Sequence, residues 1–281
     1  AQALLSRVME MPTRITDRAA LDRNRARARR APVTFLHEAA RADLEDRLAM
    51  VNRRFTAPAV VSPMPEVWEG LAPGARHVGP AETLDLGEGA QDLLVHAMDL
   101  HWADDPVGQL VQSRRALRPD GPVLAVLPGG RTLHELRAAL GQAETEVTGG
   151  LSPRVLPMGE IRDLGSLLQR AGFALPVADS VTFTASYSSA LHLMRELRAM
   201  GEGNALAARL RRPTRRAVIL RAAELYAQGF GTAEGRVPAT FELVVLTGWA
   251  PDASQPQPLR PGSAGTRLAD ALGTSETKLR D

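Results

Sequence analysis

Residues 91–130 read QDLLVHAMDLHWADDPVGQLVQSRRALRPDGPVLAVLPGG, and their pattern decides the fold class. Residues 93–95 form a short apolar run, which is typical of a strand that is buried on both faces. Residues 106–117 begin with proline and carry apolar side chains at helical spacing, so they predict a helix with one buried face. The turn RPDG ends this helix before a second apolar run at 123–127. Two strands that a helix joins in this way are almost always parallel, so the stretch predicts an open α/β sheet.

Polar side chains follow both strands, at residues 96–102 and 128–131, where an open parallel sheet binds its ligands. His101 and Asp104 are the catalytic candidates, because a histidine at such a place can act as a general base near neutral pH. A competing interpretation needs no chemistry: Trp102 packs against the following helix, and Asp104 caps that helix.

A second group of polar residues near the end of the second strand predicts a site for an anionic or protein substrate. It comprises Arg131, His134 and Arg154, with Trp102 as a further candidate for contact with a partner. Residues 132–135 read TLHE, which is typical of a capping box at the start of a helix. The capping box accounts for its threonine and glutamate and leaves Arg131 free to bind a ligand.

The composition of the 281 residues limits the classes of function. The chain has no cysteine, which excludes disulfides and cysteine ligands, and its six histidines lack paired ligand spacing, so we expect no metal site. The net charge is only +2. The arginine-rich run at 23–30 has no interleaved aromatic residues to stack bases, which favours a solvated or partner-facing helix over a nucleic-acid site.

Strands and helices alternate along the rest of the chain, so the pattern predicts one α/β domain. We expect an irregular leader at 1–12, a domain at 13–250 with a helical insertion at about 188–235, and an irregular tail at 251–281. The further elements expected inside the domain are helices at 16–31, 34–54 and 65–71, strands at 59–62 and 75–79, helices at 132–146, 161–171, 189–200 and 213–228, and strands at 181–187 and 241–249. Two late strands separated by helices favour a mostly parallel sheet whose final strands pair antiparallel.

Neither a membrane span nor a secretory signal is visible in the sequence, because no apolar run is long enough for either. We therefore expect a cytoplasmic protein that reaches the inner membrane, if at all, through a partner.

The layout and several short blocks resemble the class I S-adenosylmethionine-dependent methyltransferases, whose fold is Rossmann-like. More narrowly, they resemble the branch that contains the respiratory complex I assembly factor 5, and at greater distance the malonyl-acyl-carrier-protein methyltransferase of biotin synthesis. The resemblance runs in order from about residue 14 to residue 272. The blocks that carry it are FLH at 35–37, LHW at 100–102, RALRPDG at 115–121, GGRTLHELR at 129–137, LSPRV at 151–155, LLQRAGF at 167–173 and LTGWAP at 246–251.

The resemblance implies S-adenosylmethionine as the cofactor, held by an acidic, glycine-rich loop (DLGxGxG) after the first strand. The matching residues are Val61, Ser62, Pro63, Met64 and Pro65, so two prolines replace loop glycines and a valine stands at the acidic position. Proline fixes φ and lacks an amide donor. We therefore expect binding of the cofactor to be weakened or lost.

Two other features bear on the cofactor. The family places a ribose-binding carboxylate at the end of the second strand, and Glu82 stands at about that distance after the loop. The interval between the loop and His101 is shorter than in the family, by enough to remove a strand or most of a crossover. Residues 84–89, LDLGEG, imitate the missing loop, but too few residues separate them from the RPDG turn, which favours a plain surface loop.

Three functions are compatible with these residues. The resemblance implies an assembly or scaffolding factor with weakened or lost cofactor binding and a protein partner, since the family's assembly factor is associated with hydroxylation of an arginine on a complex I subunit. The alternative is an active S-adenosylmethionine-dependent methyltransferase with an atypical loop. The third, a nucleic-acid binder that uses the arginine-rich N-terminus, has the least support.

Overall fold

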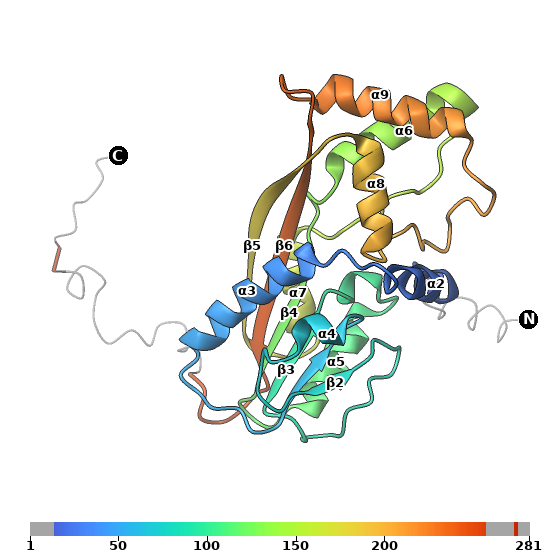
Figure 1. The fold of residues 1–281 in the computed structure, drawn as a ribbon. Coiled ribbons are helices and arrows are strands. Elements are labelled where there is room, and N and C mark those ends of the chain that lie inside the picture. The colour runs from blue at the N-terminus through green and yellow to red at the C-terminus, as the bar shows by residue number, and fades with distance from the viewer. Residues whose placement is uncertain (1–13, 257–272, 275–281) are drawn as a thin grey trace, which may run out of the picture. The chain divides into compact units, whose positions relative to one another are not determined.

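The computed structural model describes residues 14–256 and 273–274. The chain divides into two compact units, Ala1–Pro251 and Asp252–Asp281, and the helices and strands of Figure 1 lie in the first. The expected leader at 1–12 and most of the expected tail lie outside the described residues. No helix in the described ranges is long and apolar enough to cross a membrane.

Six strands form one sheet in the order β2-β1-β3-β4-β6-β5 (Figure 1). β1 runs parallel to β2 and β3, and β3 parallel to β4, whereas β6 runs antiparallel to both β4 and β5. The order confirms the expected Rossmann-like methyltransferase fold with antiparallel final strands. The strands are β1 Pro58–Val61, β2 Arg76–Val78, β3 Leu93–Ala97, β4 Pro122–Pro128, β5 Ala174–Tyr187 and β6 Val237–Trp249.

Alternation of side chains along the central strands divides the core between the two faces of the sheet. Val95 and Val126 face one core, which α3, α6, α8 and α9 cover. Leu94 and Leu127 face the other core, which α5 and α7 cover. The helices are α2 Arg18–Ala28, α3 Phe35–Met50, α4 Pro65–Trp68, η1 Leu100–Trp102, α5 Pro106–Ala116, α6 His134–Thr148, α7 Ile161–Arg170, α8 Ala190–Ala199 and α9 Arg216–Phe230.

The central strand-helix-strand unit is confirmed as β3, α5 and β4, but one detail of its helix start is wrong. Asp105 caps α5, because its side chain accepts a hydrogen bond from the Gly108 amide at 2.8 Å. Asp104 does not cap this helix. Its carboxylate accepts from the amides of Ile15 and Thr16 at 2.8 and 2.9 Å, so it ties the segment before α2 to the carboxyl edge of the sheet.

The expected capping box at 132–135 is also wrong. α6 begins at His134, and the residue before it has a left-handed backbone and makes no side-chain cap. The Thr132 hydroxyl instead donates to the carbonyl of Glu242 at 3.0 Å, and the Glu135 carboxylate accepts from the amide and hydroxyl of Thr240. The motif therefore fastens α6 to β6 rather than closing its own first turn.

The late strands are longer than their patterns predict, while the helical insertion is confirmed. β5 begins seven residues before the expected start at 181, because both of its faces are partly exposed over that stretch and no alternation marks it. α8 and α9 form the insertion between β5 and β6. On the opposite edge of the sheet, β2 connects to β3 through residues 79–92, which contain no helix.

Candidate functional site

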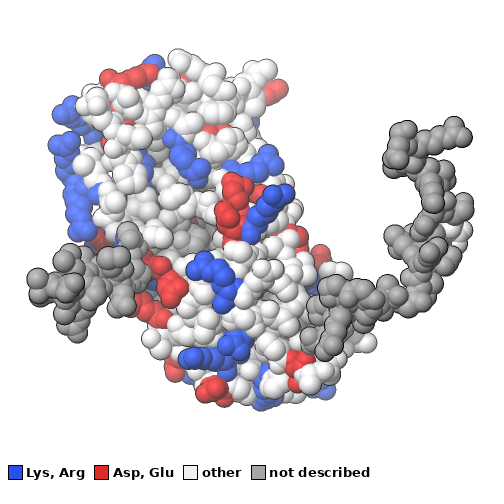
Figure 2. Space-filling model, turned by 180° about the vertical axis from the view of Figure 1, so that it is seen from behind, with Lys and Arg blue, Asp and Glu red and all other residues white. Residues whose placement is uncertain are grey.

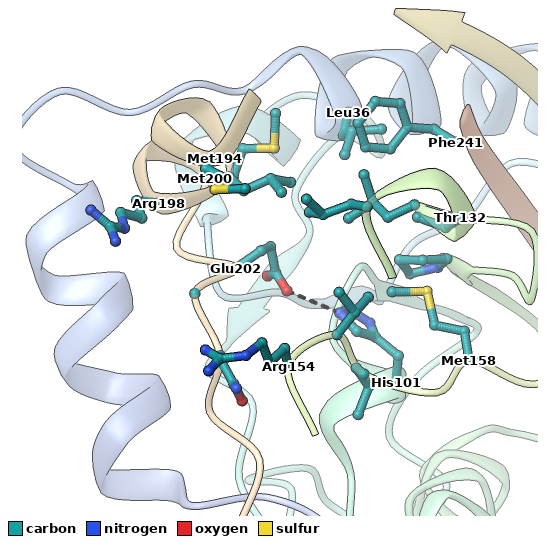
Figure 3. A pocket seen from close by; sticks show the side chains of 18 of the residues that line it. Leu36, His101, Thr132, Arg154, Met158, Met194, Arg198, Met200, Glu202 and Phe241 are labelled. Carbon is teal, nitrogen blue, oxygen red and sulfur yellow. Dashed lines mark hydrogen bonds and ion pairs between the residues drawn. The ribbon is translucent and has the colours of Figure 1, made fainter. Parts of the chain in front are cut away.

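A cavity of about 240 Å³ lies beyond the carboxyl ends of β3 and β4. Met98, which follows β3, and Pro128, the last residue of β4, line it from the sheet side. Helices α3, α6 and α8 and the connection from α8 to α9 supply most of the remaining wall. Much of the lining is apolar, including Met158, Met194 and Met200 (Figure 3). Ligands of open α/β sheets bind at this edge, so the cavity is the first candidate for a substrate site.

Three polar side chains meet in this cavity: His101 and Trp102 from η1, and Glu202 just after α8. The indole nitrogen of Trp102 donates to Glu202 Oε2 at 2.6 Å, and His101 Nε2 lies 3.3 Å from the same oxygen (Figure 3). Burial raises the pKa of Glu202, but the hydrogen bond and charge of His101, the charge of Arg25 and the Trp102 indole outweigh it and lower this pKa to about 2. Glu202 is thus an ionised carboxylate in a largely apolar cavity.

The ionised carboxylate of Glu202 determines which ring nitrogen of His101 carries a proton. A carboxylate only accepts hydrogen bonds, so His101 Nε2 carries the proton and donates it. The His101 side chain is 4% exposed, and its Nδ1 is buried with no hydrogen-bond partner among the described residues. Trp102 belongs to an apolar cluster with Leu21, Leu156 and Leu206, and this cluster contains no residue of α5.

A second histidine, His37 of α3, also lines the cavity. The Trp68 indole donates to its Nδ1 at 3.1 Å, so the proton of the neutral imidazole lies on Nε2. Burial lowers the pKa of His37 to about 4, which keeps the ring neutral at physiological pH. Within the described residues, no group of three or more histidine, aspartate or glutamate side chains could hold a metal ion.

Arg154 lines the cavity, but its charge is already matched. Its Nη2 and Nε donate to the two carboxylate oxygens of Glu144 at 2.6 and 2.9 Å, and its Nη1 donates to the Thr214 hydroxyl at 2.9 Å. The hydrogen bond from Arg154 is the largest cause that lowers the pKa of Glu144 to about 2. Arg154 therefore joins α6 to the connection between α8 and α9.

The other predicted site residues do not line this cavity. Arg131 is exposed, and its amide donates to Glu242 Oε2 at 3.0 Å. His134 is exposed beside it, with Nδ1 at 3.1 Å from the Arg131 carbonyl. The Glu82 side chain is exposed, while its carbonyl accepts from Gln109 at 2.9 Å. The cavity thus brings together His101, Trp102 and Arg154, and its lining does not include Glu82, Asp104, Arg131 or His134.

The residues that match the family's cofactor loop follow β1 and are mostly buried. Ser62 is 2% exposed and Met64 is 4% exposed, and the Ser62 hydroxyl accepts from the Met64 amide at 3.1 Å. α2 lies against this edge, where Arg25 Nη2 donates to Asp99 Oδ1 at 2.5 Å with both side chains buried. A hollow of about 460 Å³ remains here, lined by residues of α2 and of the loop, including Pro63.

Sequence reasoning missed Glu202, His37 and the Arg25–Asp99 pair. His37 had a signal, since it stands in the FLH block at 35–37. Glu202 had none, because it lies in a short connection within the helical insertion and meets Trp102 across 100 residues of chain.

Comparisons with known proteins give the chain two kinds of relative. It is 38% identical over 192 residues to the arginine-hydroxylase NDUFAF5, mitochondrial, of Danio rerio, a match that covers 67% of this chain and 59% of the relative. It is 34% identical over 173 residues to the malonyl-[acyl-carrier protein] O-methyltransferase of Xylella fastidiosa, covering 62% of this chain and 56% of the relative.

Among solved structures, the YcgJ protein of Bacillus subtilis aligns with a TM-score of 0.47 at 9% identity, over 74% of this chain and 98% of that one, and a score of this size does not establish a shared fold. No protein-family model matches the chain. The chain spans less than two thirds of the length of either curated relative. Over about two thirds of its own length, it is homologous to NDUFAF5 and, at lower identity, to the malonyl-[acyl-carrier protein] O-methyltransferase.

Proposed function

We propose that this protein is an assembly factor of methyltransferase fold that holds an arginine-bearing segment of a protein partner, a respiratory complex I subunit, and that binds S-adenosylmethionine weakly or not at all. The observation that carries the proposal is the ionised Glu202 in the 240 Å³ cavity. The similarity to NDUFAF5, an arginine-hydroxylase by name, supports an arginine as the group that enters.

The geometry around Glu202 suits a guanidinium. Within the described residues, both hydrogen bonds to this carboxylate, from His101 and Trp102, fall on Oε2. A guanidinium has two parallel donors, so it can use Oε1 and pair with the charge. The apolar lining suits the methylene stem of an arginine, which packs on apolar surface while its charged end binds.

The residues on the other half of the edge do not fit S-adenosylmethionine as the family binds it. Val61 offers no carboxylate, and the prolines at 63 and 65 offer no amide donors. Arg25 and Asp99 are bound to each other, so neither charge is available without breaking a buried ion pair. The Glu82 side chain is exposed, and the Glu82 carbonyl accepts a hydrogen bond from Gln109. These four observations support weakened or lost binding.

Calorimetric titration tests the cofactor part of the proposal. We expect no heat with S-adenosylmethionine or its demethylated product at about millimolar concentration, which corresponds to a binding free energy weaker than about −4 kcal/mol. Micromolar affinity would favour the alternative, an active methyltransferase with an atypical loop. The hollow of about 460 Å³ beside the loop is the observation that favours that alternative, because it leaves room for a ligand.

Affinity capture from the native organism tests the partner part. We expect the tagged wild-type chain to capture complex I subunits. Glu202→Gln should recover at least about tenfold less of these subunits, because truncating one member of a desolvated charge pair costs about 2 kcal/mol or more. Glu45→Gln, which changes a 48% exposed carboxylate on α3, is the matched control. Equal recovery with Glu202→Gln, or capture without any complex I subunit, contradicts the proposal.

A further inference from the structure

The end of α8 and the connection from α8 to α9 concentrate positive charge, as the arginine-rich run at 23–30 also does. Residues 195–216 contain seven arginines and two glutamates, whereas the net charge of the whole chain is only +2. Residues 209–216 read RLRRPTRR. Figure 2 shows basic side chains gathered along the edge of the molecule that carries this connection in Figure 1.

Part of this charge is matched inside the protein and part is not. Arg209 and Arg211 lie 2.8 and 3.6 Å from the carboxylate of Asp17. Arg212, Arg215 and Arg216 are exposed, and none of them pairs with a carboxylate of the described residues. The same holds for Arg198, which projects from α8 (Figure 3). We call these four residues, Arg198, Arg212, Arg215 and Arg216, the arginine row.

The start of α9 adds to the same positive potential. Arg215 is the N-cap residue and makes no side-chain cap, and the first turn contains no acidic residue. Cations at a helix N-terminus are unfavourable, because the macrodipole already carries positive charge there. Arg215 and Arg216 therefore lie where positive charge destabilises the helix, which points to a role for them in binding a ligand.

The arginine row borders the cavity. Arg198 and Thr214 both line it, and the Thr214 hydroxyl accepts a hydrogen bond from Arg154 at 2.9 Å. Arg198 of the row and Thr214, which lies between Arg212 and Arg215 in the chain, thus share the lining of the cavity with Glu202.

We propose that the arginine row binds an acidic segment of the protein partner next to the residue that enters the cavity, an inference that rests on the proposed function. Guanidinium groups pair bidentately with carboxylates, and exposed charges of one sign steer a partner of the other sign. Residues 195–216 contain no aromatic side chain on which bases could stack, which favours an acidic peptide over a nucleic acid.

Fluorescence anisotropy with defined probes tests this inference. The probes are a labelled peptide of eight glutamates, a labelled oligonucleotide of eight thymidines, and vesicles that contain phosphatidylglycerol. We expect the peptide to bind, to weaken at least about tenfold as salt rises, and to weaken by a similar factor in Arg212→Glu/Arg215→Glu. The milder Arg212→Gln/Arg215→Gln is expected to lose less, and a urea midpoint confirms that each variant is folded.

The matched control is Arg23→Glu/Arg27→Glu, which reverses two exposed arginines on α2 and is expected to leave peptide binding unchanged. No binding of the peptide, equal loss in the control, or binding of the oligonucleotide or vesicles as tight as that of the peptide overturns the inference. Glu202→Gln distinguishes this inference from the proposed function. We expect that variant to bind the peptide as the wild type does and to lose capture of complex I subunits. If the arginine-row variant captures those subunits as well as the wild type does, the inference fails while the proposed function stands.

Discussion

The two halves of the carboxyl edge of the sheet use their charges differently. On the side of β1, Arg25 of α2 forms a buried ion pair with Asp99, which follows β3, and the loop after β1 is packed. Beyond β3 and β4, the ionised Glu202 lies in a cavity, held by an indole and an imidazole and by no directly paired arginine of the described residues. The Arg25–Asp99 pair is closed within the fold, whereas Glu202 borders a cavity. We therefore expect substitutions in the first half to change stability and substitutions in the second half to change binding.

Breaking the Arg25–Asp99 pair is expected to cause the largest loss of stability. Arg25→Met leaves Asp99 buried without a partner, and removing one member of a buried ion pair costs about 3–5 kcal/mol. Urea unfolding followed by circular dichroism measures the loss.

Replacing both charges separates the pair from the packing around it. Arg25→Met/Asp99→Leu should regain most of the lost stability, because apolar replacement of a whole buried pair is often neutral. If Arg25→Met unfolds at the wild-type urea concentration, this half of the edge does not depend on the ion pair.

The second largest effect concerns pH and the histidine of the cavity wall. The folded pKa of His37 is about 4, lowered by burial from 6.5. The unfolded chain therefore binds a proton more readily, so stability from neutral His37 is complete above pH 6.5 and is lost as pH falls toward 4. The size is on the order of 3 kcal/mol. His37→Gln should flatten this part of the stability curve, whereas His134→Gln, at an exposed position, should retain it.

These first two effects also show which parts of the site a sequence can reveal. The strand-helix-strand unit was predictable, because its apolar runs, its proline and its RPDG turn are local signals. The Arg25–Asp99 pair left no local signal, since 74 residues separate its members. The same is true of Glu202 and Trp102. Long-range partners of polar side chains depend on how the helices and strands pack, and no short stretch of sequence specifies that packing.

The residues 132–135 show the opposite error, a local pattern that tertiary structure overrides. TLHE has the spacing of a capping box, yet its threonine and glutamate bond to β6, which lies 110 and 105 residues further along the chain. Burial explains the outcome: Thr132 and Glu135 are both 3% exposed, so strong partners within the core are available to them in place of a solvent-exposed first turn.

A smaller effect should follow from removing the Glu144 carboxylate on the cavity side. The pKa of Glu144 is lowered to about 2, mainly by Arg154, so its contribution is present above the unfolded pKa of 4.5 and is lost as pH falls toward 2. Glu144→Gln should cost about 2 kcal/mol at pH 7, the value of hydrogen bonds to a charged group. The difference between wild type and variant, from urea midpoints, should shrink between pH 4.5 and 2. A difference that is constant over that range contradicts the assigned role of the pair.

The smallest effect is expected from restoring glycine at the two loop prolines. Pro63→Gly/Pro65→Gly should lower stability by about 1 kcal/mol per site or less, because glycine gives the unfolded chain more freedom. Pro73→Gly, at an exposed turn, is the control for this entropic term. We expect calorimetry with S-adenosylmethionine to remain silent, since Val61 still supplies no carboxylate and Arg25 still holds Asp99. If the glycine variant releases heat with S-adenosylmethionine, the two prolines were the obstacle to cofactor binding. Continued silence leaves Val61, the Arg25–Asp99 pair and the short interval between this loop and His101 as the remaining causes.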